Sequence, residues 1–260
     1  MSSDIIQSLI LGIVQGITEF FPVSSTAHLI LFPWFFNWEG EVNTLMFDVA
    51  LHAGTLLALM ICFYRDWIDM VMRDRKMLGI ILVATIPAGL VGALLHHAVE
   101  NALRSPLIIV FSTTAFGILM IAAEKLSKMN KDRTSMADGI FIGVAQAIAL
   151  IPGVSRSGIT ITAGMFRNLD RASAARFSFL LSTPIIAGAV LLEGRKLLHA
   201  TEAYHIDTVV AGFLAAFFSG LFAIKFLMSF LKKYPLNIFA YYRFALAALI
   251  LVMWISRSRG

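Results

Sequence analysis

The sequence predicts an all-α polytopic membrane protein, with six transmembrane helices plus two re-entrant helical hairpins in two inverted-topology repeats. The first observation is the composition: 58% of the 260 residues are hydrophobic and only 14% are charged, whereas soluble domains carry about 25% charged residues. The second is that the apolar residues form six long blocks, and the third is that a segment near the N-terminus recurs in the second half. Together these observations exclude a water-soluble protein.

Each of the six apolar blocks approaches the roughly 17–25 residues that cross a bilayer as a helix. The blocks cover residues 46–64, 78–95, 105–123, 177–192, 208–231 and 238–255. No low-complexity stretch or long linker separates them, so we expect residues 1–260 to form a single membrane domain. The first residues lack the basic start of a signal peptide, so the N-terminal apolar stretch should remain in the mature protein. The lone Cys62 excludes an intramolecular disulfide.

The basic residues indicate the orientation of the spans. Lys and Arg gather in the loops 65–76, 125–133, 167–176 and 232–233, whereas the loops 96–104 and 193–207 carry fewer for their length. By the positive-inside rule the basic loops are cytoplasmic, which places both termini on the outer side of the membrane. The net charge of +5 is then a topology signal, and nucleic-acid binding is not expected.

Residues 12–26 recur at residues 143–157, about half the chain further on. Identical pairs are Gly12/Gly143, Gln15/Gln146, Ile17/Ile148, Val23/Val154 and Ser24/Ser155. Three long spans follow each copy, and an odd number of crossings makes the second half enter from the opposite face. We therefore predict inverted repeats over about 1–128 and about 134–260, an architecture that places binding sites near the midplane at the repeat interface.

Each copy of the repeat reads as two short helices separated by a break. In the first copy, an apolar helix over residues 5–21 is followed by Pro22 and hydroxyl residues, and then by the apolar run 29–36. Residues 139–166 repeat this arrangement around Pro152. Broken short helices are typical of re-entrant hairpins, whose backbone must be satisfied by protein or water. Since the two hairpins enter from opposite faces, their tips should meet.

Gln15 and Glu19 give the first hairpin a polar face, because residues four apart project from the same side of a helix. A carboxylate at membrane depth costs about 2.5–3.5 kcal/mol, so we expect Glu19 to face a cavity and to have a function there. A structural hydrogen bond to a neighbouring helix is the alternative.

The hydroxyls of Ser24, Ser25 and Thr26 lie where the second short helix begins. They can cap it, and capping alone is the simpler interpretation for a single serine. Three hydroxyls followed by His28 favour chemistry, because a helix N-terminus binds anions, a hydroxyl can be a nucleophile and a histidine can move its proton. His52 has no such neighbours, and we interpret it as structural.

The second hairpin carries an arginine among glycines and hydroxyls. Its guanidinium offers a planar set of donors that matches two phosphate oxygens at once. The residues that we expect to share this anion site are Gly153, Ser155, Arg156, Ser157 and Thr160. A structural ion pair between Arg156 and Glu19 is the alternative, and it leaves the surrounding hydroxyls and glycines unexplained.

Three stretches of the chain resemble a known family in order along its length. They are QGITEFFPVSSTAH at residues 15–28, PGVSRSGIT at residues 152–160 and FAYYRF at residues 239–244. They are similar to the motifs of the undecaprenyl-diphosphate phosphatase (bacitracin-resistance) family. The resemblance implies hydrolysis of undecaprenyl diphosphate to undecaprenyl phosphate and inorganic phosphate at the outer face of the bacterial inner membrane. This reaction recycles the carrier lipid for peptidoglycan synthesis, and it implies a divalent cation, Mg²⁺ or Ca²⁺.

By position, the resemblance implies which residues are catalytic. They are Glu19, Ser25, His28 and Arg156. Gln15 stands where some members have Glu, which removes a charge from the metal site, and Phe21 and Ala27 replace the commonest Leu and Gly.

We expect Ser25 to attack the terminal phosphorus, with a metal-activated water as the alternative nucleophile, and His28 to act as general base and then acid. Glu19 would hold the cation. The expected substrate-binding residues, besides Arg156, are Gln15, Ser24, Thr26, Gly153, Ser155, Ser157 and Thr160. Phosphoryl transfer needs mainly such positioning and charge stabilisation.

Two other functions fit parts of the sequence. Inverted repeats with broken helices are typical of transporters, so a lipid-phosphate transporter or flippase using the same midplane site is the main alternative. An anion channel would suit Arg156 but gives Glu19 no purpose. The expected partners are a polyprenyl diphosphate lipid and the bilayer, and the sequence leaves a homodimer open.

Overall fold

A computed structural model describes residues 3–102, 105–197 and 205–258, in which the chain is helical and forms no β-strand. Six helices in this part are long and apolar enough to cross a membrane. They are α3 (Leu45–Cys62), α5 (Arg75–Ala102), α6 (Pro106–Leu126), α9 (Arg171–Leu197), α10 (Ile206–Leu231) and α11 (Asn237–Ser258). The six predicted spans are therefore confirmed as helices. α5 and α9 continue into the expected loops 96–104 and 193–207, which lie partly outside the described residues, and a further helix, Tyr64–Met72, occupies most of the expected loop 65–76.

The remaining elements are shorter. They are α1 (Ser3–Thr18), α2 (Ser25–Phe36), α4 (Tyr64–Met72), α7 (Met136–Ala147) and α8 (Arg156–Phe166), with 3₁₀ turns η1 (Glu41–Asn43) and η2 (Ile148–Leu150). The first helix ends at Thr18 and not at residue 21 as predicted, because Pro22 disfavours helical backbone in the residue before it. The pairs α1–α2 and α7–α8 are the two predicted broken helices.

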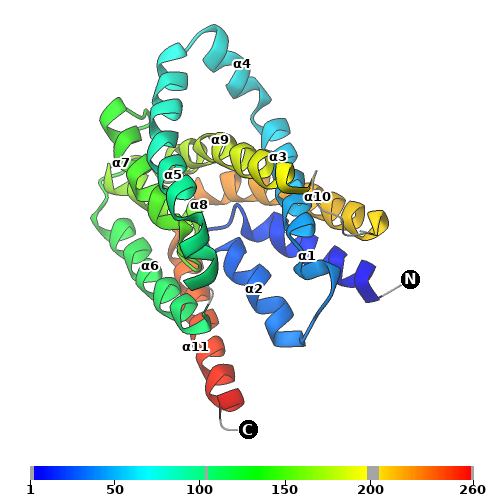
Figure 1. The fold of residues 1–260 in the computed structure, drawn as a ribbon. Helices are drawn as coiled ribbons and strands as arrows, with labels where there is room; N and C mark the ends of the chain where they lie inside the picture. Colours follow the sequence, from blue (N-terminus) through cyan, green and yellow to red (C-terminus); the bar gives the residue numbers. More distant parts are fainter. Residues whose placement is uncertain (1–2, 103–104, 198–204, 259–260) are drawn as a thin grey trace.

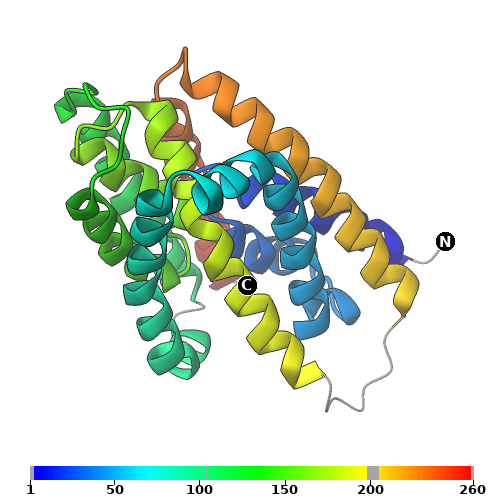
Figure 2. The same ribbon diagram turned by 90° about the horizontal axis from the view of Figure 1, so that it is seen from above.

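Small residues let α1 lie directly against α10, which runs beside it in Figure 2. A Cβ atom on Gly12 would come within 2.5 Å of the carbonyl oxygen of Gly212, and one on Gly16 within 2.5 Å of that of Ala216. Neither position therefore accepts a side chain without moving the helices apart. On the other side of the molecule α11 packs along α6, while α7 lies beside α5 and α8 beside α9 (Figure 1).

Arg243 of α11 joins the two helix breaks. Its side chain is fully buried, and its Nη1 donates to the carbonyl oxygen of Pro22 at 3.1 Å. Its Nη2 donates to those of Gly153 at 2.6 Å and Val154 at 3.0 Å, and its Nε to that of Thr113 at 3.2 Å. Carbonyl groups freed by a helix break inside a membrane must be bonded by protein or water. The single side chain of Arg243 provides these bonds for both breaks.

Candidate active site

Two serines at equivalent positions of the repeat begin the helices that meet at the site. Ser24 is the N-cap of α2 and accepts a hydrogen bond from the amide of Ala27 at 3.4 Å, and Ser155 is the N-cap of α8 and accepts from that of Gly158 at 3.1 Å. Both serines have positive φ angles, +76° and +71°, which non-glycine residues adopt at a cost and which cluster at functional sites. The Oγ of Ser24 also accepts from the amide of Gly153 at 3.2 Å, so the two breaks are in contact.

Glu19 is the residue on which both breaks converge. Its Oε1 accepts a hydrogen bond from Arg156 Nη2 at 2.5 Å, and its Oε2 accepts from Ser25 Oγ at 2.5 Å and from Gln15 Nε2 at 3.1 Å. The second terminal nitrogen of Arg156 donates to the carbonyl oxygen of Ser182 at 3.3 Å. Three predicted site residues therefore surround one buried carboxylate.

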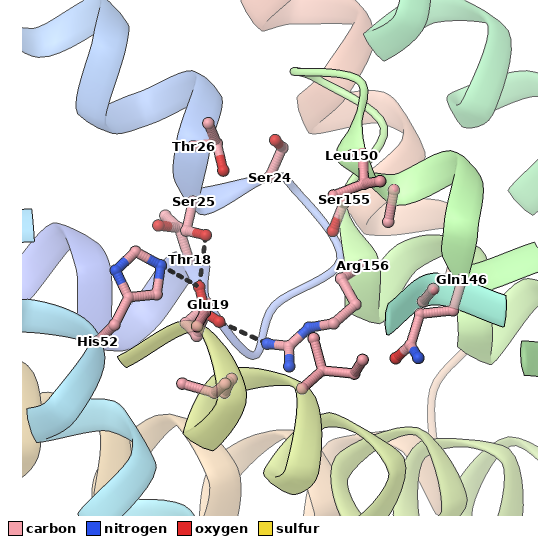
Figure 3. A pocket seen from close by; sticks show the side chains of 15 residues that line it. Thr18, Glu19, Ser24, Ser25, Thr26, His52, Gln146, Leu150, Ser155 and Arg156 are labelled. Atoms are coloured by element: carbon pink, nitrogen blue, oxygen red, sulfur yellow. Dashed lines mark hydrogen bonds and ion pairs between the residues drawn. The ribbon is translucent and has the colours of Figure 1, made fainter. Parts of the chain in front are cut away.

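A cavity of about 220 Å³ opens beside this cluster (Figure 3). Residues of α1, α2 and α3 supply polar lining: Thr18, Glu19, Ser24, Ser25, Thr26 and His52. Residues of α5, η2 and α9 supply apolar lining: Ala88, Ala149, Leu150, Ile185, Ile186 and Ala189. Gln146, Ser155 and Arg156 complete it. The lining from the first half of the chain is polar except for Ala88, whereas the second half supplies most of the apolar lining together with the polar side chains of Gln146, Ser155 and Arg156.

His52 lines the cavity, so the expectation that it lacks neighbours capable of chemistry was wrong. Its Nε2 lies 4.0 Å from Glu19 Oε2, and the pair is joined by a dashed line in Figure 3. Its Nδ1 is 2.8 Å from the carbonyl oxygen of Asp48. Because a carbonyl only accepts, Nδ1 is the nitrogen that donates here, and Nε2 is the ring nitrogen that faces Glu19. An ionisable residue within an apolar span was the signal that could have identified His52.

The family model described as "Bacitracin resistance protein BacA" matches residues 8–249. The chain belongs to the BacA family. The undecaprenyl-diphosphatase of Thermodesulfovibrio yellowstonii is 53% identical over 255 residues, which cover 98% of this chain and 99% of that protein. Proteins of the same name are 44% identical in Moorella thermoacetica, over 97% of this chain and 99% of theirs, and 43% identical in Rubrobacter xylanophilus, over 95% and 97%.

We expected His28 to act on Ser25, but within this BacA-family site the two ring nitrogens of His28 have other partners. Its Nδ1 is 2.7 Å from the carbonyl oxygen of Ser24, and its Nε2 is 2.7 Å from the hydroxyl of Tyr242, whose ring stacks on the imidazole at 5.8 Å. His28 is also absent from the cavity lining. Its two ring nitrogens are occupied by the carbonyl group of Ser24 and by Tyr242 of α11. The group that accepts the hydroxyl proton of Ser25 is therefore the carboxylate of Glu19, whereas His28 is hydrogen-bonded to the backbone of Ser24.

Four of the expected substrate-binding residues also lie outside the lining: Gln15, Gly153, Ser157 and Thr160. Ser157 Oγ donates to the carbonyl oxygen of Phe21 at 3.1 Å, which ties α8 to the first break. Thr160 Oγ1 donates to the carbonyl oxygen of Arg156 at 2.7 Å and lies 2.6 Å from Ser178 Oγ. Gly153 has φ +90° and leaves no room for a Cβ atom. These residues support the site, whereas Ser24, Thr26, Ser155 and Arg156 line the cavity and Gln15 acts on it through Glu19.

Glu19 and Gln15 carry the side-chain oxygen atoms of this cluster that could bind a divalent cation, although the carboxylate of Glu19 already accepts hydrogen bonds from Arg156, Ser25 and Gln15. Among the described residues no group of three or more His, Cys, Asp or Glu side chains could hold a metal ion. Gln15 Oε1, however, is buried without a partner in this part of the chain, next to Glu19. A carboxylate and an amide oxygen are hard ligands of the kind that Mg²⁺ and Ca²⁺ take, with waters completing the shell.

Proposed function

We propose that this membrane protein is an enzyme that hydrolyses undecaprenyl diphosphate to undecaprenyl phosphate and inorganic phosphate. The observation that carries the proposal is the Ser25 hydroxyl, which donates to Glu19 while Arg156 contacts the other oxygen of the same carboxylate. Family membership and the names of the relatives support the substrate. The reaction recycles the carrier lipid of peptidoglycan synthesis and accounts for resistance to bacitracin.

The geometry favours attack by Ser25 on the terminal phosphorus. A bond forms from Ser25 Oγ to phosphorus as the bond to the bridging oxygen breaks, and undecaprenyl phosphate leaves. The hydroxyl proton passes to Glu19, 2.5 Å away, and water then hydrolyses the phosphoserine to release phosphate. A substrate phosphate would take over the donors that Arg156 now gives to Glu19, which frees the carboxylate to accept the proton and stabilises the charge on the transferring group.

A divalent cation would be held by Glu19 and Gln15. When bound, it would neutralise negative charge on the diphosphate oxygens. The positions of Ser25 and Arg156 are set by the chain itself, through the cap at Ser24 and the ion pair at Glu19.

We also propose that the protein lies in the bacterial inner membrane with both termini on the outer side. The repeats would cover about 1–128 and about 134–260, with α1–α2 and α7–α8 as re-entrant hairpins, and a homodimer remains a prediction. The order of elements supports this architecture, because three long apolar helices follow each broken pair.

Cysteine labelling tests the topology. In a Cys62→Ala background, single cysteines at the exposed positions Asn130 and Ile206 should react with an impermeant reagent from opposite sides of the membrane. Between them lie the α7–α8 pair, which returns to its own side if it is re-entrant, and the single span α9. Reaction of both from one side would contradict the inverted repeats.

Release of phosphate from undecaprenyl diphosphate by the purified protein tests the function directly. Movement of the lipid between vesicle leaflets without phosphate release would instead indicate the transporter. As a control, the amount of inorganic phosphate released is compared with the amount of lipid diphosphate consumed. Hydrolysis requires a ratio of one to one.

Arg156→Lys should lower kcat/KM by about ten- to a hundredfold, because one charge-assisted hydrogen bond to substrate contributes about 1.5–3 kcal/mol and a lysine cannot supply two parallel donors. The melting temperature in detergent should change little, since a lysine still pairs with Glu19. Near-normal turnover in a destabilised protein would show that Arg156 serves the fold instead.

A further inference from the structure

Gln146 is a buried residue of the cavity lining whose side-chain donor and acceptor both lack a partner among the described residues. The residue is 2% exposed, and neither Nε2 nor Oε1 makes a hydrogen bond in this part of the chain. A buried amide left in this state costs free energy, so such groups in folded proteins are normally paired by protein, water or ligand. The side chain nonetheless reaches the cavity (Figure 3).

The repeat explains why this amide is free. Gln146 is the counterpart of Gln15, whose Nε2 donates to Glu19. At the position equivalent to Glu19 the second repeat has Leu150, which offers no acceptor. The same glutamine therefore donates to a carboxylate in one half of the chain, and in the other it is part of the cavity wall and has no partner among the described residues.

The polarity of the cavity gives the bound lipid a direction. Ser25, Glu19 and His52 lie on one side in Figure 3, Gln146 and Leu150 lie on the other, and Arg156 reaches between them. A cavity of about 220 Å³ is smaller than the roughly 300–1,000 Å³ of pockets that enclose drug-sized ligands. It can therefore hold a head group while the hydrocarbon tail leaves it, and the tail will leave along the apolar lining.

We propose that Gln146 binds the lipid-side phosphate of the diphosphate, the one bonded to the hydrocarbon, and so directs the terminal phosphate towards Ser25. The inference rests on the proposed function and adds the polarity of substrate binding to it. The two hydrogens on Nε2 match phosphate oxygens, and Oε1 can accept from a protonated phosphate oxygen or a water. Arg156, which lies between Gln146 and Glu19, would contact oxygens of both phosphates.

The test separates the two phosphates by using one inhibitor for each. Undecaprenyl phosphate carries only the lipid-side phosphate, and inorganic phosphate resembles the terminal one. For Gln146→Leu, we expect KM for undecaprenyl diphosphate and the inhibition constant of undecaprenyl phosphate to rise about tenfold, the loss expected for a hydrogen bond to a charged group. The inhibition constant of inorganic phosphate should stay within about twofold, and kcat should fall less than KM rises.

Gln15→Leu is the matched control, because it removes the equivalent amide from the other repeat. It should lower kcat through Glu19 and raise the inhibition constant of undecaprenyl phosphate less than Gln146→Leu does. The inference is wrong if Gln146→Leu leaves KM and both inhibition constants at wild-type values. It is also wrong if the substitution weakens only the inhibition by inorganic phosphate.

A stability measurement and a second substitution test whether Gln146 has only a structural role. Removing an unpaired buried amide should leave the melting temperature of Gln146→Leu equal to or above that of the wild type. Gln146→Glu keeps the size and adds a negative charge, so it should raise KM more than the leucine does, whereas a residue needed only for polar packing would tolerate Glu better. Should the wild type release no phosphate, the proposed function fails, and direct binding of undecaprenyl phosphate to both proteins still decides the role of Gln146.

Discussion

Glu19→Gln should reduce phosphate release by at least about a thousandfold while the protein remains inserted and folded. The substitution keeps the size of the side chain and removes the charge that accepts from Ser25, pairs with Arg156 and would hold a cation. General base catalysis alone contributes about 10²–10⁴-fold, and a cation ligand would add to this. The measurement is the turnover of undecaprenyl diphosphate across a Mg²⁺ and Ca²⁺ titration, with melting temperature as the control for folding.

Retained activity with an unchanged metal dependence would assign Glu19 to the structure alone. Gln15→Glu is the companion variant, because it adds a second carboxylate beside the first. It should change the affinity for the cation or the preference between Mg²⁺ and Ca²⁺. No change would place Gln15 outside the coordination shell.

Ser25→Ala should remove nearly all turnover, by about three orders of magnitude or more, because the nucleophile of a covalent mechanism has no substitute. Binding of the lipid diphosphate should persist, since Arg156 and Gln146 are untouched. The decisive measurement is a phosphoserine at position 25 trapped by acid quenching during turnover. Thr26→Ala, which removes a neighbouring hydroxyl of the lining, should cost less than about tenfold. A substantial residual rate in Ser25→Ala would indicate that water is the nucleophile and that Ser25 serves only as a hydrogen-bond donor to Glu19.

The spans were predictable because each one is set by local composition. A run of about twenty apolar residues has few alternatives to a membrane helix. All six were found, four of them close to their expected bounds, while α5 and α9 extend well beyond the apolar runs that predicted them. The contact between the two breaks followed from the internal repeat, and the cap at Ser24 from its position before an apolar run. The end of α1 was misplaced by three residues because the apolar residues Phe20 and Phe21 continue the pattern beyond the helix.

The partners of the side chains could not be predicted in the same way. His28 follows the hydroxyls so closely in sequence that it was paired with Ser25, but its direction depends on the start of α2 and on Tyr242, which is more than two hundred residues away. His52 reaches Glu19 only because α3 packs against α1. Gln146 was visible as a copy of Gln15, yet its free amide depends on Leu150 and on the cavity. Such contacts follow from helix packing, which short sequence patterns do not encode.

Arg243 makes the assembly of the site depend on α11, a helix that is synthesised after both breaks. The carbonyl groups of Pro22, Gly153 and Val154 receive their hydrogen bonds from this one residue of α11. During insertion both breaks are therefore present before their common donor exists, and water must solvate them until α11 docks. A chain that stops before residue 237 would keep five long helices but no ordered site, which makes docking of the C-terminal helix the step at which an inserted chain becomes a competent enzyme.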